Sequence, residues 1–352
     1  MMSSPSLKAI IKQYKPALIA ARSKQIKAHQ WQALHAIERC RTPQSGQLYV
    51  QCQDCAHAHW SPLSCGHRHC PTCQNHEVNQ WLDRQQQKLL PVDYYIVTFT
   101  LPAELRPLVW KHQRLIYSLF FNCVSSTLKS FGLNPDKLDG NVGLTAVLHT
   151  HSRRLDYHPH IHVVIPGGGI NKTRKQWKKL KGKYLFNAYS LAKVFRARFL
   201  TALKENSLCA AHKPPEKWVV NVQNVGQGLP ALRYLSRYLY RGVINEKNIV
   251  KNEKGYITFK YIDSTTKKPA YRTLKGEDFL YLILKHVLPT GFRRVRDYGF
   301  LHANAKQLLK LVQLILQVTL ENKPLRPRAK FICLQCQSEM KISIIQHASR
   351  SG

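Results

Sequence analysis

Apolar residues recur at helical spacing in the first forty residues of the chain. The pattern over residues 7–14 fits one amphipathic helix, and residues 18–37 continue it. Proline removes a main-chain donor and clashes with the preceding turn, so Pro16 predicts a break between two helices. A shorter helix is expected around residues 81–90, because Pro91 ends its pattern.

The middle of the chain alternates between strand-like and helical patterns. Runs of β-branched and aromatic residues predict four strands, over residues 94–101, 142–149, 160–165 and 218–225. Helical spacing lies between or after them, over residues 103–131, 191–204 and 229–241. The resulting β-α-β-β-α-β-α order predicts an α+β fold.

The last third of the chain predicts a mixed region. Residues 256–262 and 270–274 fit a hairpin, and residues 278–287 a helix. A basic stretch over 292–296 precedes a leucine-rich helix near 303–320.

Targeting signals are not evident in this pattern. No apolar run approaches the ~20 residues that a membrane span requires. Lys8, Lys12 and Lys15 interrupt the apolar residues of the N-terminus, which is unlike a signal peptide. We therefore expect an unprocessed cytoplasmic protein.

The strong positive charge of the chain indicates the kind of partner it binds. The 352 residues include 54 Lys and Arg against 19 Asp and Glu, a formal charge of +35. Such a charge favours a polyanionic partner, either nucleic acid or a membrane surface. With 44% hydrophobic and 10% aromatic residues the chain is unlike a disordered basic tail. One segment, residues 171–183, holds seven cations and no acid, and its candidate DNA-binding residues are Lys172, Arg174, Lys175, Lys178, Lys179, Lys181 and Lys183.

Cysteines are concentrated near the N-terminus, where six of the ten lie between Cys40 and Cys73. Two CxxC pairs, formed by Cys52, Cys55, Cys70 and Cys73, are separated by fourteen residues. This spacing is typical of a four-cysteine structural Zn²⁺ site, because each turn aims two thiolates at one metal. In a reducing compartment disulfides are the weaker alternative.

Other residues could complete or alter this zinc site. His57, His59, Cys65, His67 and His69 lie between the two pairs, and any of them could replace a cysteine.

A second metal site is also open. Cys40 and Cys65 could contribute to it. A third pair, Cys333 and Cys336, is either half of a site completed by Cys40, Cys65 or His347, or an unpaired surface turn. Cys123 and Cys209 are interpreted as small core residues.

A histidine pair lies in the third predicted strand. The two-residue period of a strand directs His160 and His162 to one face and Ile161 to the other. Two imidazoles on one face can share a divalent cation. His149 is a tentative third ligand, with Asp156 and His158 as alternatives.

Two tyrosines share one face of the predicted helix over 229–241. Tyr234 and Tyr238 fall about 40° apart, and the leucines of the helix form a separate stripe. Arg237 and Arg241 flank the phenols and could hold a phosphate. A phenol titrates near pH ~10, so attack at neutral pH requires a nearby cation and a polarised phosphate. On this helix alone, amphipathic packing is the favoured explanation of the two tyrosines.

Three motifs in this order resemble bacterial rolling-circle transposases of the insertion sequence ninety-one family. The string 157–164, running into the prolyl-glycine run 166–169, resembles their HUH motif (two histidines around a hydrophobic residue), and 234–241 resembles their two-tyrosine helix. Residues 65–73 resemble their N-terminal zinc module. The strings 99–102 and 294–299 also resemble that family, so the resemblance runs from about residue 35 to 300.

The resemblance implies an HUH endonuclease-like domain, with His160 and His162 holding Mg²⁺ or Mn²⁺ and Tyr234 and Tyr238 as nucleophiles. One tyrosine would attack single-stranded DNA at a transposon end and form a 5′-phosphotyrosine. The fold is then an antiparallel sheet with helices, an N-terminal helical and zinc-binding module and a mixed C-terminal region. The expected segments are N-terminal helices (1–48), a zinc module (49–90), a catalytic domain (91–245), an α/β extension (246–325) and a tail with the last CxxC (326–352).

Two rival functions remain open at this point. A rolling-circle plasmid replication initiator uses the same chemistry at a plasmid origin. A non-catalytic zinc-dependent nucleic-acid-binding protein would explain the charge and the cysteines, but it leaves the histidine and tyrosine pairs as coincidence.

Overall fold

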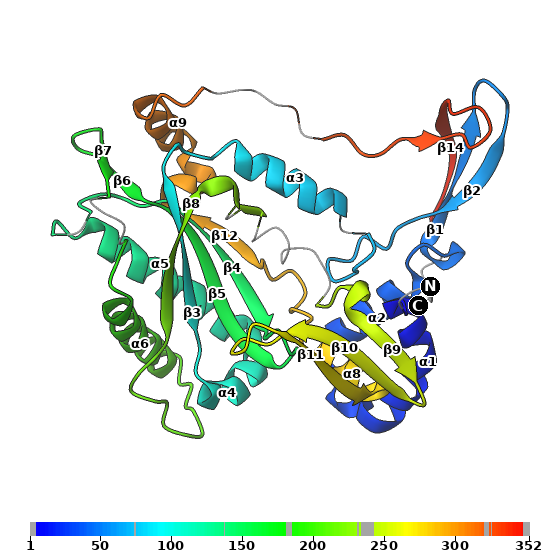
Figure 1. The fold of residues 1–352 in the computed structure, drawn as a ribbon, viewed down its shortest axis with the longest axis horizontal. Helices are drawn as coiled ribbons and strands as arrows, with labels where there is room; N and C mark the ends of the chain where they lie inside the picture. Colours follow the sequence, from blue (N-terminus) through cyan, green and yellow to red (C-terminus); the bar gives the residue numbers. More distant parts are fainter. Residues whose placement is uncertain are drawn as a thin grey trace.

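The computed structural model describes residues 5–347, apart from 74, 137, 181–184, 231, 234–242, 320–323 and 325. These residues form an α+β structure with three regions, which are visible in Figure 1: a five-stranded sheet with helices, a lobe of helices and strands from both halves of the chain, and a projecting four-stranded sheet. Within the described residues, no helix is both long and apolar enough to cross a bilayer.

The five-stranded sheet is antiparallel and has the strand order β12-β4-β5-β3-β8. Its strands are β3 (Asp93–Thr100), β4 (Leu144–His151), β5 (Tyr157–Pro166), β8 (Val220–Gln227) and β12 (Val295–Tyr298). Four of them confirm the predicted strands. The fifth, β12, was predicted only as part of a basic stretch, because its four residues alternate too briefly to be recognised.

One face of this sheet carries the main hydrophobic core. Ile161 and Val163 of β5 point into it, together with Leu148 of β4. The helices α5 (Gln113–Leu133) and α6 (Ala188–Glu205) cover this face, and the short η3 (Ala103–Leu105) and α4 (Arg106–Lys111) lead into α5. The helical spacing of 103–131 and 191–204 is thereby confirmed.

The opposite face is covered differently. There Val147 and Val164 pack with Trp81 of α3 (Asn75–Gln86) and with Leu232. Helix α3 begins about six residues before the predicted helix over 81–90, because its first turn is polar and gave no apolar periodicity.

The second lobe joins the start of the chain to its later part. Helices α1 (Leu7–Arg22) and α2 (Ala28–Arg39) share a core with α8 (Gly276–Leu284) and a sheet ordered β11-β10-β9. Those strands are β9 (Ile249–Glu253), β10 (Tyr256–Ile262) and β11 (Pro269–Lys275). Helix α8 lies so close to α1 that a Cβ on Gly276 would come within 2.2 Å of the Tyr14 ring.

The predicted break at Pro16 is wrong. Pro16 lies inside α1, and the chain breaks instead at η1 (Ser23–Gln25). Proline removes one hydrogen bond, but Ile10 and Leu18 on either side are fully buried against the lobe, and this packing outweighs the local preference.

The basic segment forms part of a small hairpin. Strands β6 (Gly168–Asn171) and β7 (Gln176–Lys179) pair, and α9 (Lys306–Ile315) packs beside them with η5 (Gly299–Leu301). Three short turns, η2 (Pro43–Ser45), η4 (Glu246–Asn248) and η6 (Ala303–Ala305), are also present among the described residues. The predicted helix over 229–241 lies largely outside them.

The projecting sheet joins the two ends of the chain. Its order is β13-β14-β1-β2, where β1 (Gly46–Cys52) pairs antiparallel with β14 (Glu339–His347). Strands β2 (Ala58–Pro62) and β13 (Phe331–Ile332) form the edges. The segment expected to be a tail is therefore paired with the expected zinc module (Figure 1).

Candidate active site and metal centres

Three histidines converge on the face of the five-stranded sheet opposite the main core. His160 pairs with His149 across β4 and β5, and His162 lies one pleat further along on the same face. Ligand nitrogens of all three lie within 4.8 Å of one another. The strand period thus brings together His160, His162 and the tentative third ligand, His149, in an arrangement that fits one metal ion.

A hydrogen bond at Nδ1 orients two of these imidazoles, those of His160 and His162. The Nδ1 of His160 lies 2.7 Å from the carbonyl oxygen of His158. A carbonyl only accepts, so Nδ1 carries the proton and Nε2 is free to bind a cation. The Nδ1 of His162 lies 2.8 Å from the hydroxyl of Thr98, its partner on β3.

Burial keeps the histidine cluster neutral. It lowers the pKa of His160 to about 3, with His162 adding repulsion, and lowers the pKa of His162 to about 4. The pKa of His149 is also well below its usual range, because of burial and of the two neighbouring imidazoles. Neutral imidazole is the form that binds metal.

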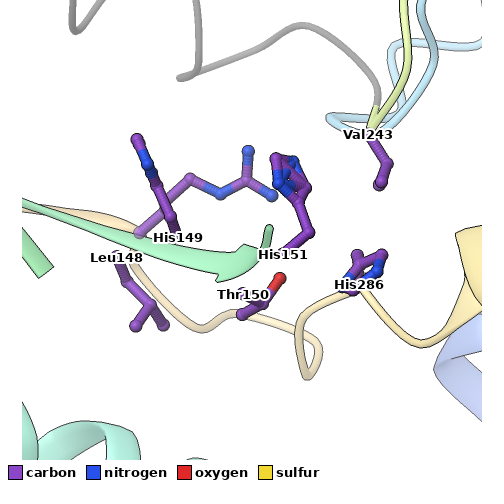
Figure 2. A pocket seen from close by; sticks show the side chains of 7 residues that line it. Leu148, His149, Thr150, His151, Val243 and His286 are labelled. Atoms are coloured by element: carbon purple, nitrogen blue, oxygen red, sulfur yellow. The ribbon is translucent and has the colours of Figure 1, made fainter. Parts of the chain in front are cut away.

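A pocket adjoins the cluster at the end of β4. Figure 2 shows His149, His151 and Val243 beside it, with His286 opposite. Arg294 lines the same pocket, and His286 Nε2 lies 2.8 Å from the carbonyl oxygen of Leu155. A cation and further imidazoles therefore surround the site.

The sequence patterns assigned no role at this site to Thr98, Arg294 or His286. Thr98 could have been found from the strand alternation of β3, which matches that of β5. Arg294 begins the string 294–299 that resembles the family, but it lies 145 positions after His149, and no local pattern connects the two.

The predicted nucleophiles Tyr234 and Tyr238, with Arg237 and Arg241, lie outside the described residues. The residues on either side of that segment are described, and both are near the histidine face. Leu232 packs with Val147 and Val164, which neighbour the histidines, and Val243 lines the pocket beside His149.

The prediction of one zinc site from both N-terminal CxxC pairs is wrong. Cys70 and Cys73 lie with Cys40 and Cys65, whereas Cys52 and Cys55 lie with Cys333 and Cys336. The extra histidines of this region are not members of either cluster. The reason is topological: β1 and its turn belong to the projecting sheet, and the 65–73 turn packs on the second lobe.

The cluster of Cys40, Cys65, Cys70 and Cys73 is partly enclosed. Cys70 is fully buried, and the Sγ atoms of Cys65 and Cys73 are 3.6 Å apart. Hydrogen bonds from the thiols of Cys65 and Cys73 hold the pKa of Cys70 far below its usual range. A thiolate among three further sulfur atoms suits Zn²⁺.

The turn of this cluster is fastened to the loop that leads to Arg294. The Arg68 guanidinium donates to the carbonyl oxygens of Leu288 (3.0 Å) and Pro289 (2.7 Å), and also to that of Phe292. The N–H of Leu288 donates to Nε2 of His69, 3.2 Å away. The cysteine cluster therefore helps position one side of the histidine pocket.

Basic residues gather in two other places. A groove between the projecting sheet, the 63–73 turn and the start of α3 is lined by six cations, Arg41, Arg68, Arg326, Arg328, Lys330 and Lys341. Two of them are paired with acids, Arg326 with Asp83 and Lys330 with Glu339.

On the hairpin, Lys172, Arg174, Lys175 and Lys179 are exposed, whereas Lys178 lies 3.7 Å from Asp139. Lys181 and Lys183 lie outside the described part of the chain.

Comparison with known proteins agrees with this combination of sites. Residues 10–101 match a family model described as "Transposase zinc-binding domain" of the insertion sequence ninety-one type, and residues 143–308 match one described as "Putative transposase".

Two relatives extend the match over most of the chain. A "Putative transposase" of Sinorhizobium fredii is 32% identical over 334 residues, which span 88% of this chain and 83% of that protein. A "Transposase for insertion sequence element IS801" of Pseudomonas savastanoi pv. phaseolicola is 26% identical over 285 residues, spanning 74% of this chain and 68% of that protein. The resemblance inferred from the motifs is confirmed, and the chain belongs to the insertion sequence ninety-one family of transposases.

Proposed function

We propose that this transposase acts by rolling-circle chemistry, cutting and joining single-stranded DNA with a tyrosine nucleophile at the histidine cluster. The observation that carries the proposal is the convergence of His149, His160 and His162 on one sheet face. Together with the tyrosine motif it supports the assignment of an HUH endonuclease-like site.

The donor set fits a divalent cation. Three neutral imidazoles occupy one side of an ion and leave its other positions for phosphate oxygen or water. Bound Mg²⁺ or Mn²⁺ would stabilise negative charge on the scissile phosphate. Mg²⁺ prefers oxygen ligands, so this all-nitrogen set favours Mn²⁺ of the two.

Tyr234 or Tyr238 supplies the attacking phenol oxygen. An Oη–P bond forms as the P–O3′ bond breaks, which leaves a 5′-phosphotyrosine and a free 3′-hydroxyl. The phenol loses its proton to solvent and the departing 3′-oxygen gains one, so the step is balanced without an oxidant. Arg237 and Arg241 offset the phosphate charge. A later attack by a 3′-hydroxyl on the phosphotyrosine joins the strands and frees the enzyme.

The described neighbours of the tyrosine segment support this role. Leu232 is two residues before Tyr234 and is buried beside the histidine face, and Val243 lines the pocket at His149. Residues that flank the nucleophile segment on both sides therefore lie at the histidine face.

DNA binding is shared among the basic surfaces. The groove cations and the exposed Lys172, Arg174 and Lys175 of the hairpin would neutralise backbone phosphates. The zinc cluster of Cys40, Cys65, Cys70 and Cys73 holds the groove residue Arg68 in place.

The test is a covalent adduct assay. Full-length protein is incubated with Mn²⁺ or Mg²⁺ and single-stranded oligonucleotides that carry candidate transposon ends. We expect an adduct that survives denaturation in the wild type and in the matched control Tyr240→Phe, and none in Tyr234→Phe/Tyr238→Phe. An adduct that persists in the double variant rules out the proposed nucleophiles. Preference for a plasmid-origin oligonucleotide over transposon ends would point to a replication initiator.

A further inference from the structure

Two CxxC turns from opposite ends of the chain face each other in the projecting sheet. The Sγ atoms of Cys52 and Cys336 are 3.4 Å apart, and those of Cys55 and Cys333 are 3.5 Å apart. All four sulfur atoms lie within 4.8 Å of one another. These pairs are 284 and 278 positions apart in the sequence, so the fold alone brings them together.

The two turns have the same backbone geometry. The N–H of Cys52 donates to the carbonyl oxygen of His57 (2.8 Å), and that of Cys333 donates to the carbonyl oxygen of Ser338 (2.9 Å). Directly after the second cysteine, Ala56 has a φ of 56° and Gln337 one of 62°. Two turns with unrelated sequences thus share a left-handed position and the same hydrogen bond, and each aims a pair of thiols at the same point.

The sulfur separations distinguish metal binding from disulfide formation. A disulfide requires sulfur atoms about 2.05 Å apart, which the 3.4 Å and 3.5 Å contacts exceed widely. Four thiolates around Zn²⁺, each ~2.3 Å from the metal, form a tetrahedron with edges of about 3.8 Å. The Cys52–Cys336 and Cys55–Cys333 contacts are within about 0.4 Å of this edge, and all four sulfur atoms lie within 4.8 Å of one another, so small side-chain shifts accommodate the ion.

Apolar packing in the projecting sheet is sparse. Its buried hydrophobic cluster consists of Val50, Cys52, Cys333 and Met340, with Leu48 and Phe331 partly buried against it. On β14, Ile342, Ile344 and Ile345 are half exposed. So small a core is typical of modules that a metal holds together.

We propose that a second Zn²⁺ ion binds Cys52, Cys55, Cys333 and Cys336 and fastens the C-terminal hairpin to the N-terminal one. The site is distinct from the cluster of Cys40, Cys65, Cys70 and Cys73. The matched zinc-binding segment, residues 10–101, contains two of its four ligands. The ion cross-links residue 52 to residue 336 and so closes the intervening chain into a loop. It thereby keeps residues 326–342 along the basic groove.

Metal content of the purified full-length protein tests the proposal. We expect two zinc ions per chain in the wild type and in the control Cys209→Ser. Cys209 lies outside both clusters and is exposed, so its interpretation as a core residue is wrong. Cys55→Ser/Cys336→Ser changes the two exposed ligands and should halve the zinc content. Wild-type zinc content in this double variant overturns the proposal.

A second readout applies if the double variant folds poorly. A specific protease site is inserted after Val318, and the cleaved full-length protein is passed over a sizing column. The C-terminal fragment should stay bound with zinc present and separate after chelation. Co-elution with the metal removed overturns the role of the ion as a fastener. Neither measurement depends on DNA cleavage, so the proposed transposition chemistry can fail without affecting them.

Discussion

The histidine cluster and the projecting sheet position their candidate metal ligands in opposite ways. Around the histidines, the sheet has a large apolar core on its far face and a smaller one beside the cluster. In the projecting sheet, the apolar core is limited to Val50, Met340 and two of the cysteines themselves. Packing therefore holds the first site in shape, whereas we expect the second to depend on the proposed zinc ion.

The proposed function gives this difference a reason. If the histidine cluster exchanges DNA strands as we propose, its ligands must keep their geometry when a cation and a phosphate leave, and backbone pairing between β4 and β5 supports that. A DNA-binding module needs only correct placement of its charges, and a metal can supply this with few residues.

The largest expected effect separates chemistry from binding. His160→Ala/His162→Ala should lower adduct formation by about 10²–10³-fold or more, the scale of losing a preorganised electrostatic stabiliser. DNA affinity should change little, because phosphate contacts dominate it. Cleavage rates and filter binding measure the two, with His212→Ala, at an exposed histidine, as the control. If the cleavage rate and the DNA affinity fall equally, the histidines do not act in metal-dependent chemistry separate from DNA binding.

A smaller effect is expected at the residue that orients His162. Thr98→Val removes the hydroxyl 2.8 Å from Nδ1 and should weaken activation by Mn²⁺ by about 10–100-fold, the usual scale for such partners. Thr98→Ser keeps the hydroxyl and should restore activation. Titrating the cleavage rate with Mn²⁺ measures the change. Thr98→Val with an unaltered Mn²⁺ dependence would show that the hydroxyl is not needed.

Removing zinc should affect the two regions unequally. Chelation should increase amide hydrogen exchange at least about tenfold in residues 339–347, which corresponds to ~1.4 kcal/mol of lost protection. Residues 144–151 and 157–166 should stay protected, because apolar packing holds them. Exchange followed by mass spectrometry, with and without chelator, compares them directly. Equal deprotection of both regions would remove the distinction drawn above.

The smallest effect concerns the basic hairpin. Lys172→Ala/Lys175→Ala removes two exposed cations. Each phosphate contact to a single strand contributes ~0.7 to the slope of log affinity against log salt, so the slope should fall by about 1.4. The control Lys251→Ala/Lys260→Ala changes exposed lysines on the second lobe and should leave the slope unaltered. Salt titrations of DNA binding measure this slope. Equal slopes in both variants would show that the hairpin lysines do not contact the DNA backbone.

Local patterns were sufficient for the elements that build the histidine site. The alternation around His160 and the apolar runs of β3, β4, β5 and β8 predicted the strands, because a buried sheet imposes a period of two on its sequence. The same alternation placed His160 and His162 on one face. His149 was one of three alternatives, and only the register between β4 and β5 selected it.

Local patterns failed where distant segments decide the structure. Pro16 predicted a break that tertiary packing overrides, and β12 was too short to recognise. The spacing of Cys52, Cys55, Cys70 and Cys73 predicted one zinc site, but sequence spacing carries no information about which turns meet in space.

The sequence by itself determined the family, the basic character, the α+β order and the histidine pair, because each is written in local pattern or composition. Only the tertiary structure decided which cysteines share a cluster, which third histidine joins the pair and which arginine borders the pocket. Those partners lie up to 284 positions apart and meet through strand pairing and core packing. Their proximity follows from the fold as a whole, and no single segment specifies it.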